Sequence, residues 1–261
     1  MLRFSANLSM LYPELTFLDR FDAAARDGFT GVEYLGPYSE TPEAITERLQ
    51  KNNLTQALFN LPSGDWAGGE RGIGALPGRE ADFRRGVTEA IRYATVLGCT
   101  QVNCLAGIPK GATPEAAEAT LVANLSYAAP RLAHAGIRLL LEPINPFDIP
   151  GFFVNSSTLA LRIFDRVNND NLFLQYDFYH MQRVQGELIA TFKALMPRIA
   201  HVQVADNPGR NEPGTGEINY PFIFAELERL GYDGWVGAEY KPSSSTSGGL
   251  GWLKSYRGAA A

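Results

Sequence analysis

The chain has 261 residues, of which 45% are hydrophobic and 20% charged, the composition of an ordinary globular protein with one large domain or two small ones. Its formal net charge is −5, so it lacks the basic excess with which nucleic-acid-binding proteins neutralise phosphates. We therefore expect neither DNA nor RNA as a partner.

The cysteines and the N-terminus predict a cellular compartment. Cys99 and Cys104 are too few for a disulfide framework, and reduced, packed cysteines are typical of the cytoplasm. Residues 1–7 hold no long apolar run, and no stretch is apolar enough to cross a membrane. We expect a cytoplasmic protein without a membrane partner. Its oligomeric state stays open, a homo-oligomer included.

Short apolar runs alternate along the chain with longer segments of helical periodicity. The predicted strands are 2–8, 31–34, 54–61, 101–105, 137–141, 172–176, 199–204 and 235–238. The predicted helices are 17–26, one that opens at Thr41-Pro42-Glu43, 80–97, 113 to about 135, 157–167, 186–196 and 220–230. After the last strand, the Ser/Gly run 243–251 predicts a loop, with Trp252 and Tyr256 packing back on the fold.

This alternation predicts the fold class. Strands separated by helices run parallel, because each crossover returns the chain to the same end of the sheet. Eight such units in this length favour a (β/α)8 TIM barrel of one domain, residues 1–261. An open, doubly wound sheet is the alternative, but no Gly-x-Gly-x-x-Gly turn follows the first strand.

Four polar residues end successive predicted strands: Glu142, Asp177, Gln203 and Glu239. Their spacing is about one strand–helix unit, so in a barrel they meet at the C-terminal mouth, where active sites form. Three carboxylates and an amide oxygen are ligands that Mg²⁺ or Mn²⁺ prefers. A single carboxylate in such a place is often only a helix N-cap or a surface charge. Four such residues at equivalent positions of successive strands favour a functional cluster.

Other polar residues follow the same strand ends. His180 lies three residues after Asp177, and we expect it in a loop, bonded either to a substrate oxygen or to the backbone. The long loops 62–78 and 206–217 both leave strand C-termini and are candidate lids over the mouth. Arg71 and Arg210 lie in these loops, and Lys241 follows Glu239. His201 is predicted to be an interior histidine without a ligand role.

Several stretches resemble the hydroxypyruvate isomerase family, within the xylose isomerase-like barrel superfamily. They are residues 3–10, 64–72, 142–151, 175–182, 205–208, 212–220 and 239–242, in nearly the whole length of the chain. The resemblance implies Glu142 and Glu239 as the acid/base pair. It also implies Glu142, Asp177, Gln203 and Glu239 as the ligands where a metal is bound. Related ketose 3-epimerases have histidine in place of Gln203, which favours the isomerase branch.

The function that this resemblance implies is the interconversion of hydroxypyruvate and tartronate semialdehyde through an enediolate. A divalent ion would stabilise that species as a Lewis acid while two glutamates move the proton. Because a small oxo-acid or sugar-acid substrate is an anion, a cation should meet its carboxylate, and Arg71, Arg210 and Lys241 are the candidates. A 2-oxo-tetronate isomerase, a ketose 3-epimerase, an abasic-site endonuclease and a non-catalytic sugar-acid binder are the alternatives.

Overall fold

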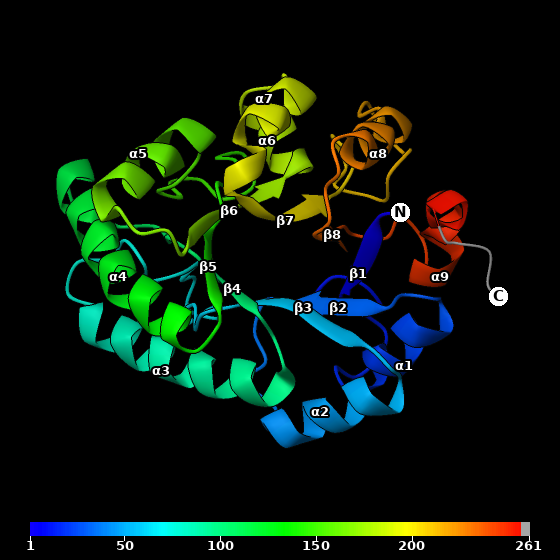
Figure 1. The fold of residues 1–261 in the computed structure, drawn as a ribbon, viewed down its shortest axis with the longest axis horizontal. Helices are drawn as coiled ribbons and strands as arrows, with labels where there is room; N and C mark the ends of the chain where they lie inside the picture. The colour runs from blue at the N-terminus through cyan, green and yellow to red at the C-terminus, as the bar shows by residue number, and fades with distance from the viewer. Residues whose placement is uncertain (257–261) are drawn as a thin grey trace. The chain divides into compact units, whose positions relative to one another are not determined.

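The computed structural model describes residues 1–256, and its eight strands form a closed barrel in which β1 to β8 follow one another in chain order (Figure 1). The predicted barrel fold is thereby confirmed. The last five residues of the predicted 1–261 domain lie outside the described residues. The chain clusters into two compact units. Unit 1 comprises residues 1–34, 43–57 and those from 176 onward, and unit 2 comprises 35–42 and 58–175.

Unit 1 is built around strands β1, β2, β7 and β8. Its elements are β1 (Arg3–Asn7), α1 (Asp19–Arg26), β2 (Gly31–Tyr34), α2 (Pro42–Lys51), α6 (Phe178–Val184), α7 (Leu188–Leu195), η1 (Met196–Arg198), β7 (Ile199–Val204), α8 (Tyr220–Arg229), β8 (Trp235–Ala238), α9 (Thr246–Gly249) and η2 (Leu250–Tyr256). Strand β1 lies between β2 and β8, and β8 also pairs with β7. In this register Asn7 lies opposite Glu33, while Ser5 and Gln203 both lie opposite Gly237.

Unit 2 is built around strands β4 and β5. Its elements are α3 (Glu80–Leu97), β4 (Gln101–Cys104), α4 (Pro114–His134), β5 (Arg138–Leu141) and α5 (Ser157–Val167), with parts of β3 (Thr55–Asn60) and β6 (Leu172–Asp177). Helices α3, α4 and α5 pack in succession in Figure 1. Helix α4 begins as the sequence predicts, because the Thr113 side chain accepts a hydrogen bond from the Ala116 amide and Pro114 occupies the first turn.

The predicted C-terminal packing is confirmed in unit 1. The Phe4 ring lies edge-on to that of Trp252, with 5.5 Å between centroids, and Phe224 lies 4.8 Å from Tyr256. Several helical boundaries differ from the prediction by one or two residues: α1 begins at Asp19, α7 spans Leu188–Leu195, and α8 ends at Arg229. In α7 the reason is local, because Glu187 takes the left-handed conformation (φ 45°), which cannot continue a helix.

The prediction missed two short helices: α6, and α9 (Thr246–Gly249), which lies in the stretch 243–251 that is predicted as a loop. His180 is expected in a loop, yet residues 178–184 form a short helix directly after β6. The side chain of Asp177, the last residue of β6, accepts a hydrogen bond from the Tyr179 amide at 2.8 Å and so acts as the helix N-cap. His180 therefore lies on a helix, and its expected loop position is wrong.

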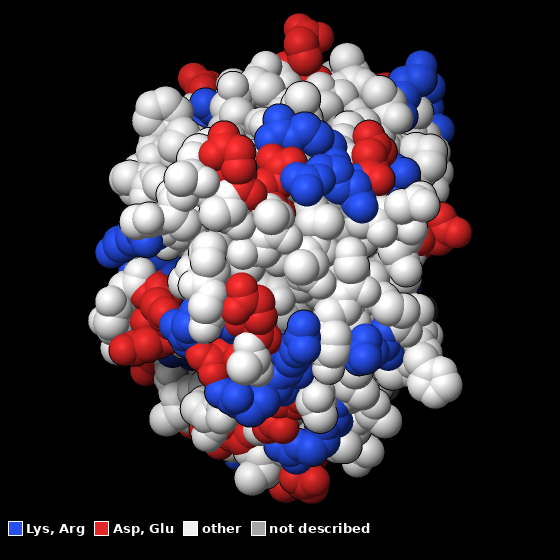
Figure 2. All heavy atoms as spheres, turned by 90° about the vertical axis from the view of Figure 1, so that its left-hand side faces the viewer, with Lys and Arg blue, Asp and Glu red and all other residues white. Residues whose placement is uncertain are grey.

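Charges of both signs are mixed on the surface. Figure 2 shows Lys and Arg next to Asp and Glu on the face that it presents. Some of these opposite charges form ion pairs, as Glu118 does with Arg162 and Arg166. Among residues 1–256, no helix is long and apolar enough to cross a membrane.

Candidate active site

Glu142 follows β5 in unit 2 and is 4% exposed. Asn103 of β4 lies beside it, with Nδ2 3.4 Å from Glu142 Oε2, and the same Nδ2 donates to Asn60 Oδ1 at 3.1 Å. A buried carboxylate is costly unless donors surround it. Strand β4 thus supplies a polar neighbour to the Glu142 carboxylate, and β3 holds that neighbour through Asn60.

Asp177 has two roles in unit 1, because its two oxygens face different partners. Oδ1 caps helix α6, whereas Oδ2 lies 3.6 Å from His180 Nε2. Both side chains are buried, and burial holds the pKa of His180 well below its ordinary value, with the positive charges of Arg210 and Arg183 adding to the effect. His180 is therefore a neutral imidazole at neutral pH, the form that binds metals and accepts hydrogen bonds.

Gln203 of β7 is held by Glu33 of β2, a residue that the sequence analysis did not consider. Gln203 Nε2 donates to Glu33 Oε1 at 2.7 Å, and His201 Nε2 lies 2.8 Å from Glu33 Oε2. Burial raises the pKa of Glu33, but the charge of His201 and hydrogen bonds from His201, Gln203 and Ser5 outweigh it, so that the pKa lies below its ordinary value. The prediction of His201 as an interior residue is confirmed. An acidic residue inside a buried parallel strand was the available signal for Glu33.

Glu239 follows β8 and accepts two hydrogen bonds in unit 1. Asn7 Nδ2 donates to its Oε1 at 3.3 Å, and an Arg210 guanidinium nitrogen lies 3.2 Å from its Oε2. Burial raises the pKa of Glu239 to about 8; the charge of Arg210 lowers it, and those of Asp177 and Glu33 add to the rise. A carboxyl group with such a pKa gives and takes protons near neutral pH.

Arg210 is the loop cation that the structure places beside two of these carboxylates. Besides Glu239, it lies 4.0 Å from Asp177 Oδ2, and its guanidinium packs over the Tyr179 ring at 5.2 Å. The loop that presents it is organised by Asp206, whose carboxylate accepts four backbone hydrogen bonds of 2.8–3.0 Å, from residues 207, 214, 216 and 218.

The other two cations have different surroundings. Arg71, in unit 2, donates to the backbone oxygens of Trp66 and Glu70 and packs over the Trp66 ring at 4.3 Å. Lys241 is exposed, while its backbone nitrogen donates to the Arg210 oxygen at 2.8 Å. The Glu70 carboxylate pairs with Arg79, not with Arg71.

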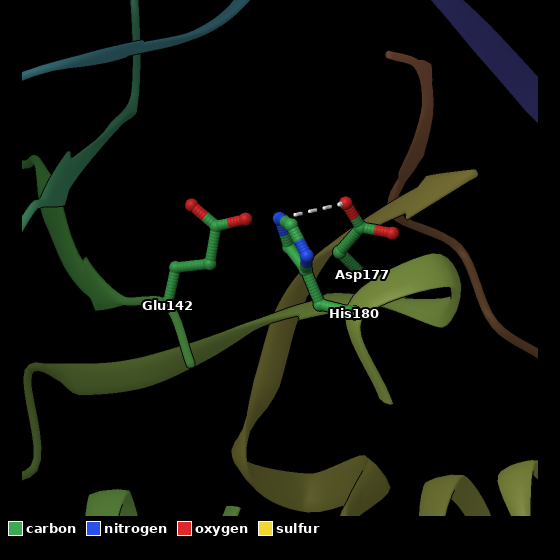
Figure 3. A group of neighbouring side chains, drawn as sticks. All are labelled: Glu142, Asp177 and His180. Carbon is green, nitrogen blue, oxygen red and sulfur yellow. Dashed lines mark ion pairs between the residues drawn. The ribbon is translucent and has the colours of Figure 1, made fainter. Parts of the chain in front are cut away.

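Asp177 and His180 form a pair of possible metal ligands in unit 1, with Asp177 Oδ2 and His180 Nε2 3.6 Å apart. Figure 3 shows the two side chains facing each other, with this contact dashed. A carboxylate and a neutral imidazole are donors that fit a divalent cation. His180, predicted to bind substrate, thus stands beside Asp177, which is predicted to bind metal.

The fold and these residues define a TIM-barrel protein with buried carboxylates at the strand ends and a candidate metal-binding group. Residues 21–256 match the model of the xylose isomerase-like TIM barrel family, and the chain belongs to that family.

Two curated relatives match over nearly the whole chain. The hydroxypyruvate isomerase of Escherichia coli K12 is 54% identical over 258 residues, which cover 98% of this chain and 100% of the relative. The 2-oxo-tetronate isomerase of Cupriavidus necator is 49% identical, with 98% and 99% covered. A crystal structure from Brucella melitensis, described as an AP endonuclease of family 2, matches with a TM-score of 0.96 and 45% identity over 99% of this chain and all of that one.

Proposed function

We propose that this chain is a hydroxypyruvate isomerase, which interconverts hydroxypyruvate and 2-hydroxy-3-oxopropanoate (tartronate semialdehyde). The observation that carries the proposal is the 54% identity to the Escherichia coli enzyme of that name over the full length of both chains. The buried glutamates, Glu142 and Glu239, supply the residue type that the chemistry needs.

The reaction moves hydrogen between neighbouring carbons. A base removes a proton from C3 of hydroxypyruvate and the C3–H electron pair forms the C2–C3 double bond, while the C2=O π pair moves to the C2 oxygen, which takes up a proton to give the enediol. The C2–C3 π pair then accepts a proton at C2 from an acid. Loss of the C3 hydroxyl proton leaves the aldehyde, so atoms and electrons balance without a further reactant. Glu142 and Glu239 are proposed for the two carbon-directed transfers. The raised pKa of Glu239 suits this role, because proton transfer is most effective when the pKa lies near the working pH.

The proposed metal ligands are Glu142, Asp177, Gln203 and Glu239, with Mg²⁺ or Mn²⁺ as the ion. When bound, such an ion supplies Lewis-acid stabilisation of the oxygens of the enediol. The approach of His180 to Asp177 supports a site for a divalent cation and adds His180 as a further candidate ligand. In the alternative role, the neutral His180 imidazole would hold a substrate oxygen.

We propose Arg210 as the partner of the substrate carboxylate. It lies against Glu239 and Asp177 and is carried by a loop with an internally fixed backbone. A guanidinium matches a carboxylate with two parallel hydrogen bonds. Arg71 and Lys241 remain candidates for later contacts with the same substrate group.

A substrate panel tests the proposal. Purified protein with Mg²⁺ or Mn²⁺ would be given hydroxypyruvate, a 2-oxo-tetronate, a ketohexose and an abasic-site oligonucleotide, and products and solvent deuterium incorporation would be followed by NMR. We expect the highest kcat/KM with hydroxypyruvate. A preference for the 2-oxo-tetronate would establish the second candidate, which the 49% identical Cupriavidus relative favours. Preference for the ketohexose, or cleavage of the oligonucleotide alone, would overturn the proposal.

The cytoplasm is the proposed location. Cys99 and Cys104 are free and buried, and burial raises the pKa of each thiol to about 12. Thiols of this kind are unreactive packing residues, as is usual in reducing compartments.

A further inference from the structure

Glu33 is a buried carboxylate at the centre of a hydrogen-bond network in unit 1. It is 0% exposed, although it lies in the middle of a strand. Its Oε2 accepts from Ser5 Oγ at 2.6 Å and lies 2.8 Å from His201 Nε2. Its Oε1 accepts from Asn7 Nδ2 at 3.2 Å and from Gln203 Nε2 at 2.7 Å. Three strands, β1, β2 and β7, therefore meet at one carboxylate.

The backbone of β8 also makes room for this carboxylate. A Cβ atom at Gly237 would overlap both carboxylate oxygens of Glu33. Gly237 pairs with Ser5 on one side and with Gln203 on the other. A residue without a side chain therefore lies between two residues that donate hydrogen bonds to Glu33. A glycine in a central strand costs stability unless something approaches it closely, and here Glu33 does.

The network decides which way the Gln203 amide points. A carboxylate oxygen accepts and cannot donate while ionised, so the short contact of 2.7 Å requires the NH2 group of Gln203 on the Glu33 side. The amide oxygen of Gln203 is consequently turned away from Glu33. Asn7 is oriented independently, because the Ser9 backbone N–H donates to its Oδ1 at 3.1 Å. Gln203 is thus the residue whose orientation depends on Glu33.

We propose that Glu33 is a positioning residue that turns the amide oxygen of Gln203 towards the divalent cation held by Asp177 and Glu239. The inference rests on the proposed function, in which these residues are metal ligands. Glu33 touches neither substrate nor ion, and it acts through the side chain that it anchors. Such outer partners of metal ligands typically change metal affinity by about 10- to 100-fold when they are removed.

Binding of Mn²⁺ alone, measured by water-proton relaxation without substrate, tests the inference. The Glu33→Met variant removes both acceptor oxygens at a similar side-chain length, and we expect its Mn²⁺ Kd to rise about 10- to 100-fold. Glu212→Met is the matched control. Glu212 is also a buried glutamate of unit 1, accepting from the Ser243 backbone N–H and Oγ, and its loss should leave the Kd within about threefold.

A double-mutant cycle separates positioning from a general structural effect. Gln203→Leu should itself weaken Mn²⁺ binding, and in that background Glu33→Met should add no further loss, because the side chain through which Glu33 acts is gone. The double variant also replaces both members of a buried hydrogen bond by apolar groups, which is better tolerated than removing one. It therefore keeps the test valid if Glu33→Met alone does not fold.

Two outcomes with the variants, and one with the wild type, would overturn the inference. One is a folded Glu33→Met protein whose Mn²⁺ Kd stays within about threefold of wild type. The other is a further tenfold loss in the double variant relative to Gln203→Leu, which would mean that Glu33 acts by another route. Wild-type protein that binds no Mn²⁺ would also overturn it. Failure of the proposed function is a separate result. The protein would then not turn over hydroxypyruvate, although the Mn²⁺ Kd values of the double-mutant cycle change as expected.

Discussion

Replacing Glu239 by glutamine should stabilise the metal-free protein, and increasingly so as the pH rises. The Glu239 side chain is 7% exposed, and burial raises its pKa from 4.5 to about 8 in spite of Arg210 at 3.2 Å. The folded chain therefore keeps this proton over a pH range in which the unfolded chain has lost it. Since the folded state binds more protons there, its stability falls as the pH rises from about 4.5 towards 8.

The size of the effect follows from the pKa difference. Each pKa unit corresponds to about 1.4 kcal/mol, so the two pKa values set an upper limit of about 5 kcal/mol above pH 8. Relaxation and water penetration reduce the cost of a buried charge, and we expect a change on the order of 2–5 kcal/mol. Glutamine has nearly the same shape and no charge to bury, so the variant lacks this pH-dependent loss.

Urea denaturation in EDTA at several pH values between 6 and 9 measures the difference in unfolding free energy between Glu239→Gln and wild type. EDTA is needed because a bound cation would favour the ionised carboxylate. Glu118→Gln is the control, since Arg162 and Arg166 hold the pKa of Glu118 below its ordinary value and both states are ionised throughout this range. A Glu239→Gln difference that stays flat within about 0.5 kcal/mol would refute the argument.

Further predictions concern activity and packing. Glu142→Gln and Glu239→Gln should each lower kcat about 100- to 10,000-fold with unchanged circular dichroism, and residual activity above about a tenth of wild type would remove that residue from the acid/base pair. Arg210→Gln should lower kcat/KM for hydroxypyruvate roughly 10- to 150-fold, the equivalent of about 1.5–3 kcal/mol for a lost charge-assisted hydrogen bond. It should have little effect on turnover of a neutral sugar, and equal losses on both would contradict a carboxylate contact. Gly237→Ala should destabilise the fold by about 1–3 kcal/mol, because its Cβ displaces the Glu33 carboxylate, and thermal unfolding at unchanged melting temperature would argue against that clash.

The sequence predicted the barrel well because its strongest signals are local. Apolar runs predicted β7 and β8 with their observed limits. Thr113 predicted the start of α4, where its side chain accepts a hydrogen bond from the Ala116 backbone N–H. Helix α6 escaped the same analysis because its N-cap, Asp177, is also the last residue of a strand. A pattern that assigns one role to each residue cannot show both.

The candidate site was predicted in part. The sequence singled out Glu142, Asp177 and Arg210, but it did not predict that His180 Nε2 lies 3.6 Å from Asp177 Oδ2, because that contact depends on the turn of α6 after Asp177. Glu33 was overlooked because it lies inside a strand and not at its end. Its partners come from positions up to 170 residues away along the chain, a relation that only the folded structure shows.

The Asp206 carboxylate determines which positions of the loop that carries Arg210 can vary in sequence. Four main-chain N–H groups bind one side chain, so the path of residues 206–218 is set by the backbone and a single carboxylate. The exposed side chains on this loop, such as Thr215 and Glu217, are then free to change without moving Arg210. We expect random libraries that leave Asp206 intact and vary those positions to alter substrate selectivity while Arg210, the proposed partner of the substrate carboxylate, stays in place. New substrate preferences can therefore evolve on this loop without a change in its backbone path.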